Sequence, residues 1–404
     1  AAERNTRMTR DELLILGADL RERTGDAPPA VYDLRIDDAS LSDSQSPQLL
    51  EHVKHQALMR SYQGRFVLLP DVANGSVVDQ MRRHYDPASM LRLDQHRSAL
   101  ETALIGPMAE RVAAEVTIQT CADYIDDMLG GIQSAPPGDF LLWLDGIDER
   151  EDLYRNFLIQ SSTDLLAEAS ASALGVIGEY GPPQSALFRI LIDEFGYGVH
   201  DKKHSVLYRK TLRGFGLSEQ YNGYWPLFDT PALALHNVIH SLFQSPRNFF
   251  RQIGFLLYAE TSYQRSTGDH YRHLRKFHPT VDATYFGEHA HIDIHHSDMV
   301  VNEVVKPLVA RFGEDVGQEI ILGAELTRAA FGVADRHLLA VSQAFDAAVQ
   351  AGEASYGLAS IKATGRCVTP DIAAGSAKLQ VGGIGQISAA AFASFPAGSI
   401  GREV

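Results

Sequence analysis

A stretch of histidines and acidic residues between positions 289 and 296 carries the strongest chemical signal in the chain. His289, Asp293 and His296 are spaced so that, on a helix turning about 100° per residue, their side chains fall within roughly 60° of one another. Two imidazoles and a carboxylate that project from one face of a helix can bind a transition metal. The sequence therefore predicts a metal site here, with the remaining ligands supplied by other helices.

A second stretch offers the same ligand types. Asp201 and His204 lie three residues apart, so two helices are each predicted to provide a carboxylate-x-x-His pair. Glu168 and Glu260 lie among apolar or small neighbours in two further stretches that we predict to be helical. Two such pairs plus one glutamate from each of two other helices form the ligand set of a carboxylate-bridged di-metal site inside a helical bundle.

The charge of these groups matches a pair of divalent cations. The four carboxylates are Glu168, Asp201, Glu260 and Asp293. Burying them without metal would cost several kcal/mol each, on the order expected for unpaired ions. Oxygen and imidazole ligands without a thiolate favour iron or manganese, and neither of the two cysteines lies near these motifs. His289 and Glu194 are predicted as additional ligands.

Length and composition limit the class of protein. The chain has 404 residues, 45% of them hydrophobic, which is enough for one large domain and an accessory part. A net charge of −15 disfavours binding to nucleic acid or an anionic membrane. No run of about 18 apolar residues predicts a membrane-spanning helix, and the first residues contain no apolar signal core. With only two cysteines, we expect a cytoplasmic protein.

Three regions are predicted along the chain. Residues 1–150 form a mostly helical accessory region that packs on the core or on a second subunit. Residues 151–350 form an all-α bundle, because helical periodicity continues throughout and no alternating strand pattern interrupts it. Residues 351–404 form a tail rich in glycine and alanine. Helix boundaries in the bundle are predicted at prolines 182, 183, 246, 279 and 307 and at Gly313.

The motifs resemble those of the haem-oxygenase-like di-iron oxidases over roughly residues 150–345. The matching residues are Tyr285-Phe286-x-x-His289-x-x-x-Asp293-x-x-His296, preceded by Asp193-Glu194-Phe195-Gly196-Tyr197-Gly198 and Asp201-x-x-His204. Members of this family have the haem oxygenase fold but use two non-haem irons and O₂, with no haem. The chain is most similar to the N-oxygenating branch, because it carries glutamates at both positions 168 and 194.

This resemblance implies a role for each candidate. His204 and His289 would be nitrogen ligands of one iron, and Asp293 and His296 would bind the other. The remaining carboxylates would be bridging, terminal or extra ligands: Glu168, Asp201, Glu260 and Glu194. A member of the N-oxygenating branch carries a C-terminal cupin with its own iron, but residues 351–404 contain no histidine, so no cupin is expected here.

The resemblance also implies a function. We expect an O₂-dependent di-iron monooxygenase of specialised biosynthesis that N-oxygenates a small amine, an amino acid or an aminoheterocycle. Electrons would come from a separate reductase or ferredoxin, since the sequence shows no nucleotide-binding loop. By resemblance, the protein would be a homodimer that associates through residues 1–150.

Other interpretations stay open on the sequence alone. The same centre could perform desaturation, decarboxylation or C–C fragmentation of an aliphatic acid or amino acid. A ferritin-like iron store would use a similar ligand set but predicts a shell-forming oligomer without an organic pocket. A haem-binding protein needs one axial histidine in a roomy cleft, a space that seven or eight inward ligands would fill. His236 and His240 form a rival metal pair at helical spacing, but no third ligand accompanies them in the sequence, which favours core or pocket histidines.

Overall fold

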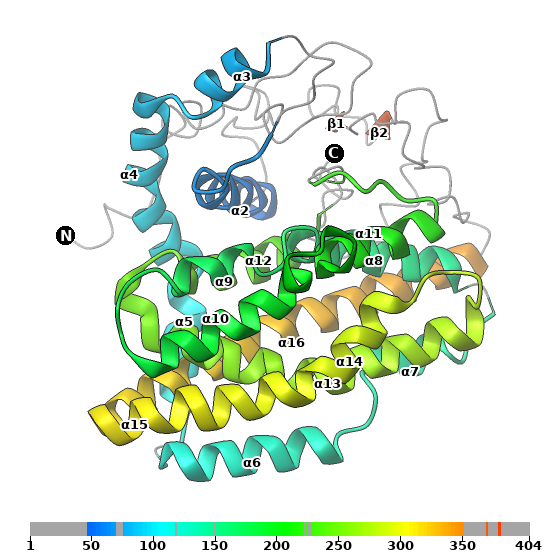
Figure 1. Ribbon diagram of the computed structural model, residues 1–404. Helices are drawn as coiled ribbons and strands as arrows, with labels where there is room; N and C mark the ends of the chain where they lie inside the picture. Colours follow the sequence, from blue (N-terminus) through cyan, green and yellow to red (C-terminus); the bar gives the residue numbers. More distant parts are fainter. Residues whose placement is uncertain are drawn as a thin grey trace.

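The computed structural model describes residues 47–69, 76–117, 119–148, 150–221, 224 and 228–350, together with the residue pairs 369–370 and 379–380. These residues form an all-α bundle, as predicted, apart from the two short pairs (Figure 1). None of the described helices combines the length and the apolar composition that crossing a bilayer requires. The described part of the predicted tail consists of two antiparallel two-residue strands: β1 (Thr369–Pro370) and β2 (Leu379–Gln380).

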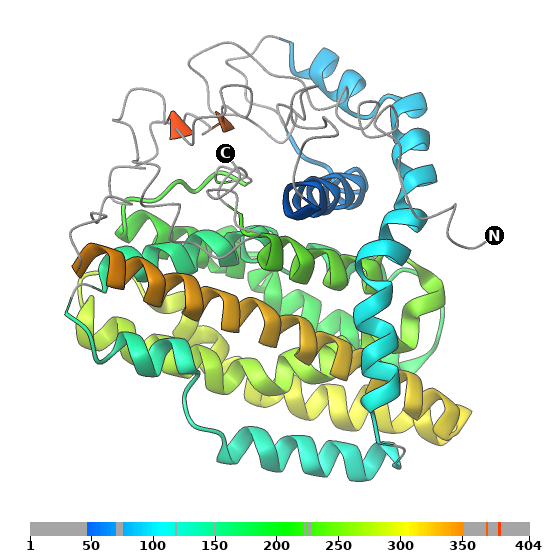
Figure 2. The ribbon, with the colours of Figure 1, turned by 180° about the vertical axis from the view of Figure 1, so that it is seen from behind.

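The described residues before 150 contain six helices. They are α2 (Pro47–Gln63), α3 (Val77–His84), α4 (Pro87–Leu104), α5 (Gly106–Glu115), α6 (Cys121–Ser134) and α7 (Asp139–Leu144). Helix α2 packs against α12, whereas α5, α6 and α7 pack along α16, so these helices contact the bundle from two sides (Figures 1 and 2). The proposed division at residue 150 stays a prediction, and residues 1–46 lie outside the described part of the chain.

A second group of described helices follows residue 150. Its α-helices are α8 (Glu151–Leu165), α9 (Ser170–Gly175), α10 (Pro182–Glu194), α11 (His204–Gly214), α12 (Thr230–Phe243), α13 (Phe249–Phe277), α14 (Thr284–Met299), α15 (Lys306–Phe312) and α16 (Glu314–Gln350). Among the described residues, these helices are connected by three 3₁₀ turns, η5 (Gly196–Gly198), η6 (His200–Lys202) and η8 (Pro246–Asn248), and by the π-helical segment η9 (Val300–Val305). Prolines 182 and 246 begin elements, and Gly313 separates α15 from α16, as the sequence predicts.

Helix α13 is the central rod of the bundle. It packs along most of its length against α14 and α16, and α14 continues through η9 into α15 (Figure 1). Gly254 and Gly323 allow this close packing, because a Cβ on Gly254 would lie 2.0 Å from the Ile320 carbonyl oxygen and one on Gly323 would lie 2.0 Å from the Arg251 carbonyl oxygen. The backbones of α13 and α16 therefore touch. This contact fixes α13, which carries Glu260 into the interior.

Candidate metal centre

Helix α14 presents its chemical groups to the interior of the bundle. His289, Asp293 and His296 are buried, and the carboxylate and the second imidazole have no exposed surface. His291 and His295, on the other side of the same helix, are exposed. The 3.6-residue period of the helix thus separates an inward ligand face from a solvated face.

A tight reversal of the chain brings Glu194 and His204 together. Helix α10 ends at Glu194, two 3₁₀ turns follow, and α11 begins at His204. The reversal requires glycine at position 196, because φ is +65° and a Cβ there would lie 2.5 Å from the Lys202 carbonyl carbon and the Lys203 nitrogen. As a result, Glu194 Oε2 lies 2.6 Å from His204 Nδ1.

These turns correct the prediction that Asp201 and His204 share one helix. Asp201 lies in η6, is exposed to solvent, and belongs to neither of the carboxylate–histidine clusters described below. Its backbone carbonyl accepts a hydrogen bond from Lys210 Nζ at 3.2 Å. The apparent similarity between Asp201-x-x-His204 and the α14 motif is therefore one of spacing only, because the first pair has no continuous helix beneath it.

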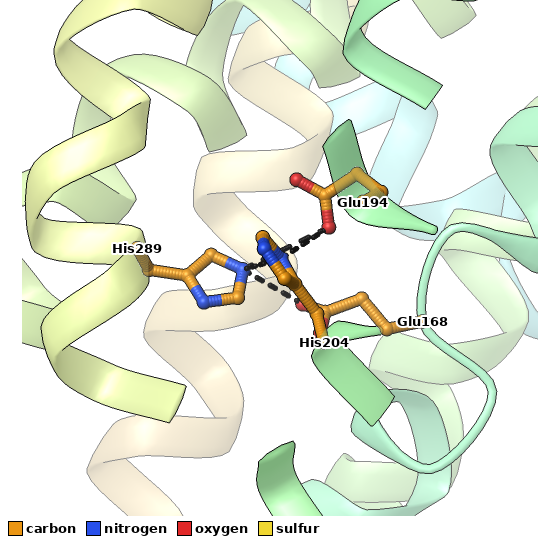
Figure 3. A group of neighbouring side chains, drawn as sticks. All are labelled: Glu168, Glu194, His204 and His289. Carbon is orange, nitrogen blue, oxygen red and sulfur yellow. Dashed lines mark hydrogen bonds and ion pairs between the residues drawn. The ribbon is translucent and has the colours of Figure 1, made fainter. Parts of the chain in front are cut away.

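The first cluster consists of four side chains from four segments (Figure 3): Glu168, Glu194, His204 and His289. His289 Nε2 lies 3.1 Å from His204 Nδ1 and 3.3 Å from Glu168 Oε1. The other ring nitrogen of His289 donates to the Tyr285 carbonyl oxygen at 3.0 Å. This hydrogen bond fixes the tautomer that leaves the Nε2 lone pair directed into the cluster, as expected for a metal-binding histidine.

Glu168 reaches the first cluster from a turn and not from a helix, which corrects the sequence prediction. It lies between α8 and α9, and the next residue, Ala169, has a left-handed φ of +65°. The Tyr285 hydroxyl donates to Glu168 Oε1 at 2.8 Å and orients the carboxylate. Glu168 Oε2 is buried and accepts no hydrogen bond from any described residue.

The second cluster lies next to the first and shares one residue with it. Its members are Glu194, Glu260, Asp293 and His296. His296 Nδ1 lies 3.2 Å from Glu260 Oε2, 3.4 Å from Asp293 Oδ1 and 3.6 Å from Glu194 Oε1. One oxygen of Glu194 thus faces His204 in the first cluster and the other faces His296 in the second. Glu194 could therefore contribute one oxygen to each cluster.

Asp193 lies in the motif that precedes His204, but the sequence predicted no role for it. Its Oδ2 lies 3.2 Å from His296 Nε2, the ring nitrogen that faces away from the second cluster. A carboxylate at that nitrogen fixes the tautomer and makes the other nitrogen a better ligand. The sequence feature that could have indicated a role for Asp193 is its position next to Glu194, at the end of α10.

The chemistry of the donor atoms fits a pair of cations. Both oxygens of Asp293 are buried and accept no hydrogen bond from the described residues, which is costly unless a cation binds them. The carboxylates Glu168, Glu194, Glu260 and Asp293 would balance two divalent ions, so Glu194 takes the place that the sequence reasoning gave to Asp201. The ligand atoms of each cluster lie within 4.8 Å of one another.

The pKa values of the side chains in the two clusters also indicate that the buried carboxylates require positive charge nearby. Burial would lower the pKa of His296, but its contacts with the Asp293 and Glu260 carboxylates outweigh burial and raise the pKa to about 12. Burial raises the pKa of Asp293 to about 7. Burial also opposes ionisation of Glu194, yet His204, His289 and His296 lower its pKa to about 2. Protons thus supply the positive charge that metal ions would supply.

Replacing Asp193 with asparagine should weaken metal binding at the second cluster. The amide cannot accept the His296 Nε2 proton with the strength of a carboxylate, so we expect iron affinity to fall about 10- to 100-fold while the fold is retained. Anaerobic titration of ferrous iron into the wild type and the variant measures this change. An unchanged affinity would mean that Asp193 contributes only to packing.

Two cavities adjoin the metal centre. One, of about 90 Å³, is lined by ligand residues including Glu168, Glu260 and His289. The other, of about 480 Å³, is lined by residues of α7, α8, α13 and α16. Asp164 and Tyr263 line both cavities. The larger cavity is therefore large enough for a small organic molecule and shares lining residues with the cavity at the candidate metal centre.

The rival pair His236 and His240 does have a third neighbour, contrary to the sequence prediction. Asp164 Oδ1 lies 2.7 Å from His236 Nδ1 and 3.8 Å from His240 Nε2. Asp164 lies on α8, 72 residues before His236, so no local spacing could reveal the contact. Asp164 and His240 line the smaller cavity.

Comparison with known proteins agrees with this geometry. Residues 155–332 match the family described as iron-containing redox enzymes. The chain is also 37% identical over 288 residues to a protein named nitrosourea synthase from Streptomyces achromogenes subsp. streptozoticus. That alignment covers 69% of this chain and 60% of the relative, so the chain spans less than two thirds of the relative's length. These matches confirm the resemblance inferred from the motifs, and the all-α bundle around residues 155–332 agrees with a haem-oxygenase-like fold.

Proposed function

We propose that the protein is an O₂-dependent non-haem di-iron oxygenase that transfers oxygen to the nitrogen of a small amine, an amino acid or an aminoheterocycle. The observation that carries this proposal is Glu194, whose two oxygens face two neighbouring clusters of carboxylates and imidazoles. The similarity to nitrosourea synthase supports nitrogen as the atom oxidised, because a nitrosourea contains an N–N=O unit.

The proposed ligand assignment divides the clusters between two iron ions. Glu168, His204 and His289 would hold one ion, Glu260, Asp293 and His296 would hold the other, and Glu194 would bridge them. A pair of ferrous ions supplies the electrons that activate O₂ for oxygen transfer. The chain itself orients the ligands through Tyr285 and Asp193 and excludes bulk water by burying the centre.

Partners follow from the same proposal. Repeated turnover requires the irons to be reduced again, and we propose a separate reductase or ferredoxin as the electron donor. We also propose that the enzyme is a homodimer that associates through residues 1–150. Size-exclusion chromatography with light scattering, on the chain with and without those residues, would test the second point.

The function is tested with ¹⁸O₂ and iron-loaded protein. Ferrous iron is added to the metal-free chain without oxygen, and ¹⁸O₂ is then supplied together with L-arginine, L-lysine or dodecanoic acid and a chemical reductant. We expect O₂ uptake and an ¹⁸O atom bonded to nitrogen in a product of one of the amines, detected by mass spectrometry. Desaturation, decarboxylation or C–C cleavage of dodecanoic acid or of an amino acid would instead support the alternative di-iron oxidase.

A further inference from the structure

Asp164 occupies the boundary between the metal centre and the larger cavity. It lies in the last turn of α8, four residues before Glu168, and lines both the 90 Å³ cavity that contains the metal ligands and the 480 Å³ cavity beside it. A substrate that entered the larger cavity and approached the metal centre would therefore pass the Asp164 carboxylate.

Two buried histidines hold this carboxylate in place. His236 Nδ1 donates to Asp164 Oδ1 at 2.7 Å, and the His236 side chain is completely buried. His240 directs Nε2 toward the same oxygen at 3.8 Å. On the other side, Thr163 Oγ1 donates to Asp164 Oδ2 at 3.3 Å. These contacts orient the carboxylate, and Oδ2 receives only the longer hydrogen bond from Thr163.

Asp164 has no lysine or arginine partner within the described part of the chain. The described ion-pair neighbours of its carboxylate are His236 and His240. Burial and the neighbouring His236 lower the pKa of His240 well below its usual value, so this imidazole is neutral. A carboxylate at the wall of a cavity without a lysine or arginine partner is a binding group for a positively charged ligand.

The triad formed by Asp164, His236 and His240 is better suited to an organic cation than to a metal ion. The Gln244 side-chain amide donates to the Tyr62 carbonyl oxygen at 3.0 Å and contacts His240 Nδ1 at 3.2 Å, so Nδ1 accepts a hydrogen bond. His240 Nε2 then carries the proton and has no lone pair for a metal. The two histidines thus direct N–H groups toward Asp164, and the Asp164 carboxylate supplies negative charge at the wall of the cavity.

We propose that Asp164, oriented by His236, binds the ammonium or guanidinium group of the substrate and positions it beside the metal centre. This inference rests on the proposed function and adds the residue that selects the substrate. The wall of the larger cavity agrees with it, since Asp335 adds negative charge there, and Arg336 lines the same cavity and would pair with an acid group of the same molecule. The apolar side chains of Phe157 and Phe286 also line this cavity.

The test compares cationic ligands with neutral molecules of similar shape. Binding of L-arginine and L-citrulline, and of L-lysine and L-norleucine, is measured by calorimetry without oxygen, on the ferrous and on the metal-free chain. We expect the wild type to bind at least one cation about tenfold more tightly than its neutral counterpart. Asp164→Asn should abolish that preference, and Asp164→Glu should restore part of it. Asp139→Asn, which removes a carboxylate from the same cavity but not from the triad, should retain it.

Metal content separates this proposal from its rivals and from the proposed function. Asp164→Asn should bind as much iron as the wild type; a loss of iron, or a third metal ion bound by the wild type and lost in the variant, would assign Asp164 to metal binding and overturn the proposal. The absence of any preference for a cation in the wild type would also overturn it. If the preference exists and depends on Asp164 while ¹⁸O is found only on carbon, the binding role stands and the proposed N-oxygenation fails.

Discussion

Replacing Glu194 with glutamine is expected to reduce bound iron to one ion or none per chain and to lower turnover by more than about 100-fold. Glutamine keeps the shape of the side chain but removes the negative charge and one of the two acceptor oxygens. Loss of a group that only supports a metal ligand already costs about 10- to 100-fold, and Glu194 faces both clusters directly. Iron per chain by elemental analysis and O₂ uptake measure the two effects.

Asp201→Asn is the matched control for this variant. Asp201 is also an acidic residue near His204 in sequence, and its spacing made it a predicted ligand, but its side chain is exposed and lies outside both clusters. We expect this variant to bind iron and turn over like the wild type. A loss of iron in Asp201→Asn together with normal iron in Glu194→Gln would reverse the assignment and restore the ligand set implied by the sequence.

The helical part of the centre was predictable because helix geometry is local. On α14, the spacing of His289, Asp293 and His296 fixes their shared face without any knowledge of the surroundings. The inward position of Glu260 on α13 could also be predicted, because this residue follows an apolar run. The all-α fold and the helix ends at several prolines depended on equally local preferences.

The remaining features depend on how the chain reverses direction and on contacts between distant segments. The 3.6-residue period says nothing about Asp201, because no helix continues from α10 through η5 and η6 to His204. Glu168 projects from a turn whose direction is set by the left-handed residue that follows it. The contact between Asp164 and His236 joins α8 to α12 and has no signature in either segment alone.

The reversal after α10 makes Gly196 the residue whose replacement should do most damage to the centre without touching a ligand. In Gly196→Ala, the new methyl group would overlap the Lys202 carbonyl carbon and the Lys203 nitrogen, both at 2.5 Å, in addition to the cost of a positive φ, about 1–2 kcal/mol. Backbone atoms cannot rotate away as a side chain can. The segment before His204 must therefore shift, and the 2.6 Å contact between Glu194 and His204 must lengthen.

Gly198→Ala separates the steric effect from the conformational one. Gly198 has a similar φ of +78°, but a Cβ there would meet no atom within 4 Å. Both variants should lose about 1–2 kcal/mol of unfolding free energy through the positive φ. Only Gly196→Ala should also lose iron affinity, by about tenfold or more, since His204 and Glu194 move apart. Chemical denaturation and ferrous titration of the two proteins measure the two quantities independently. Equal iron affinities in both variants would show that the ligand geometry tolerates the shift, and that the close approach at Gly196 serves the fold alone.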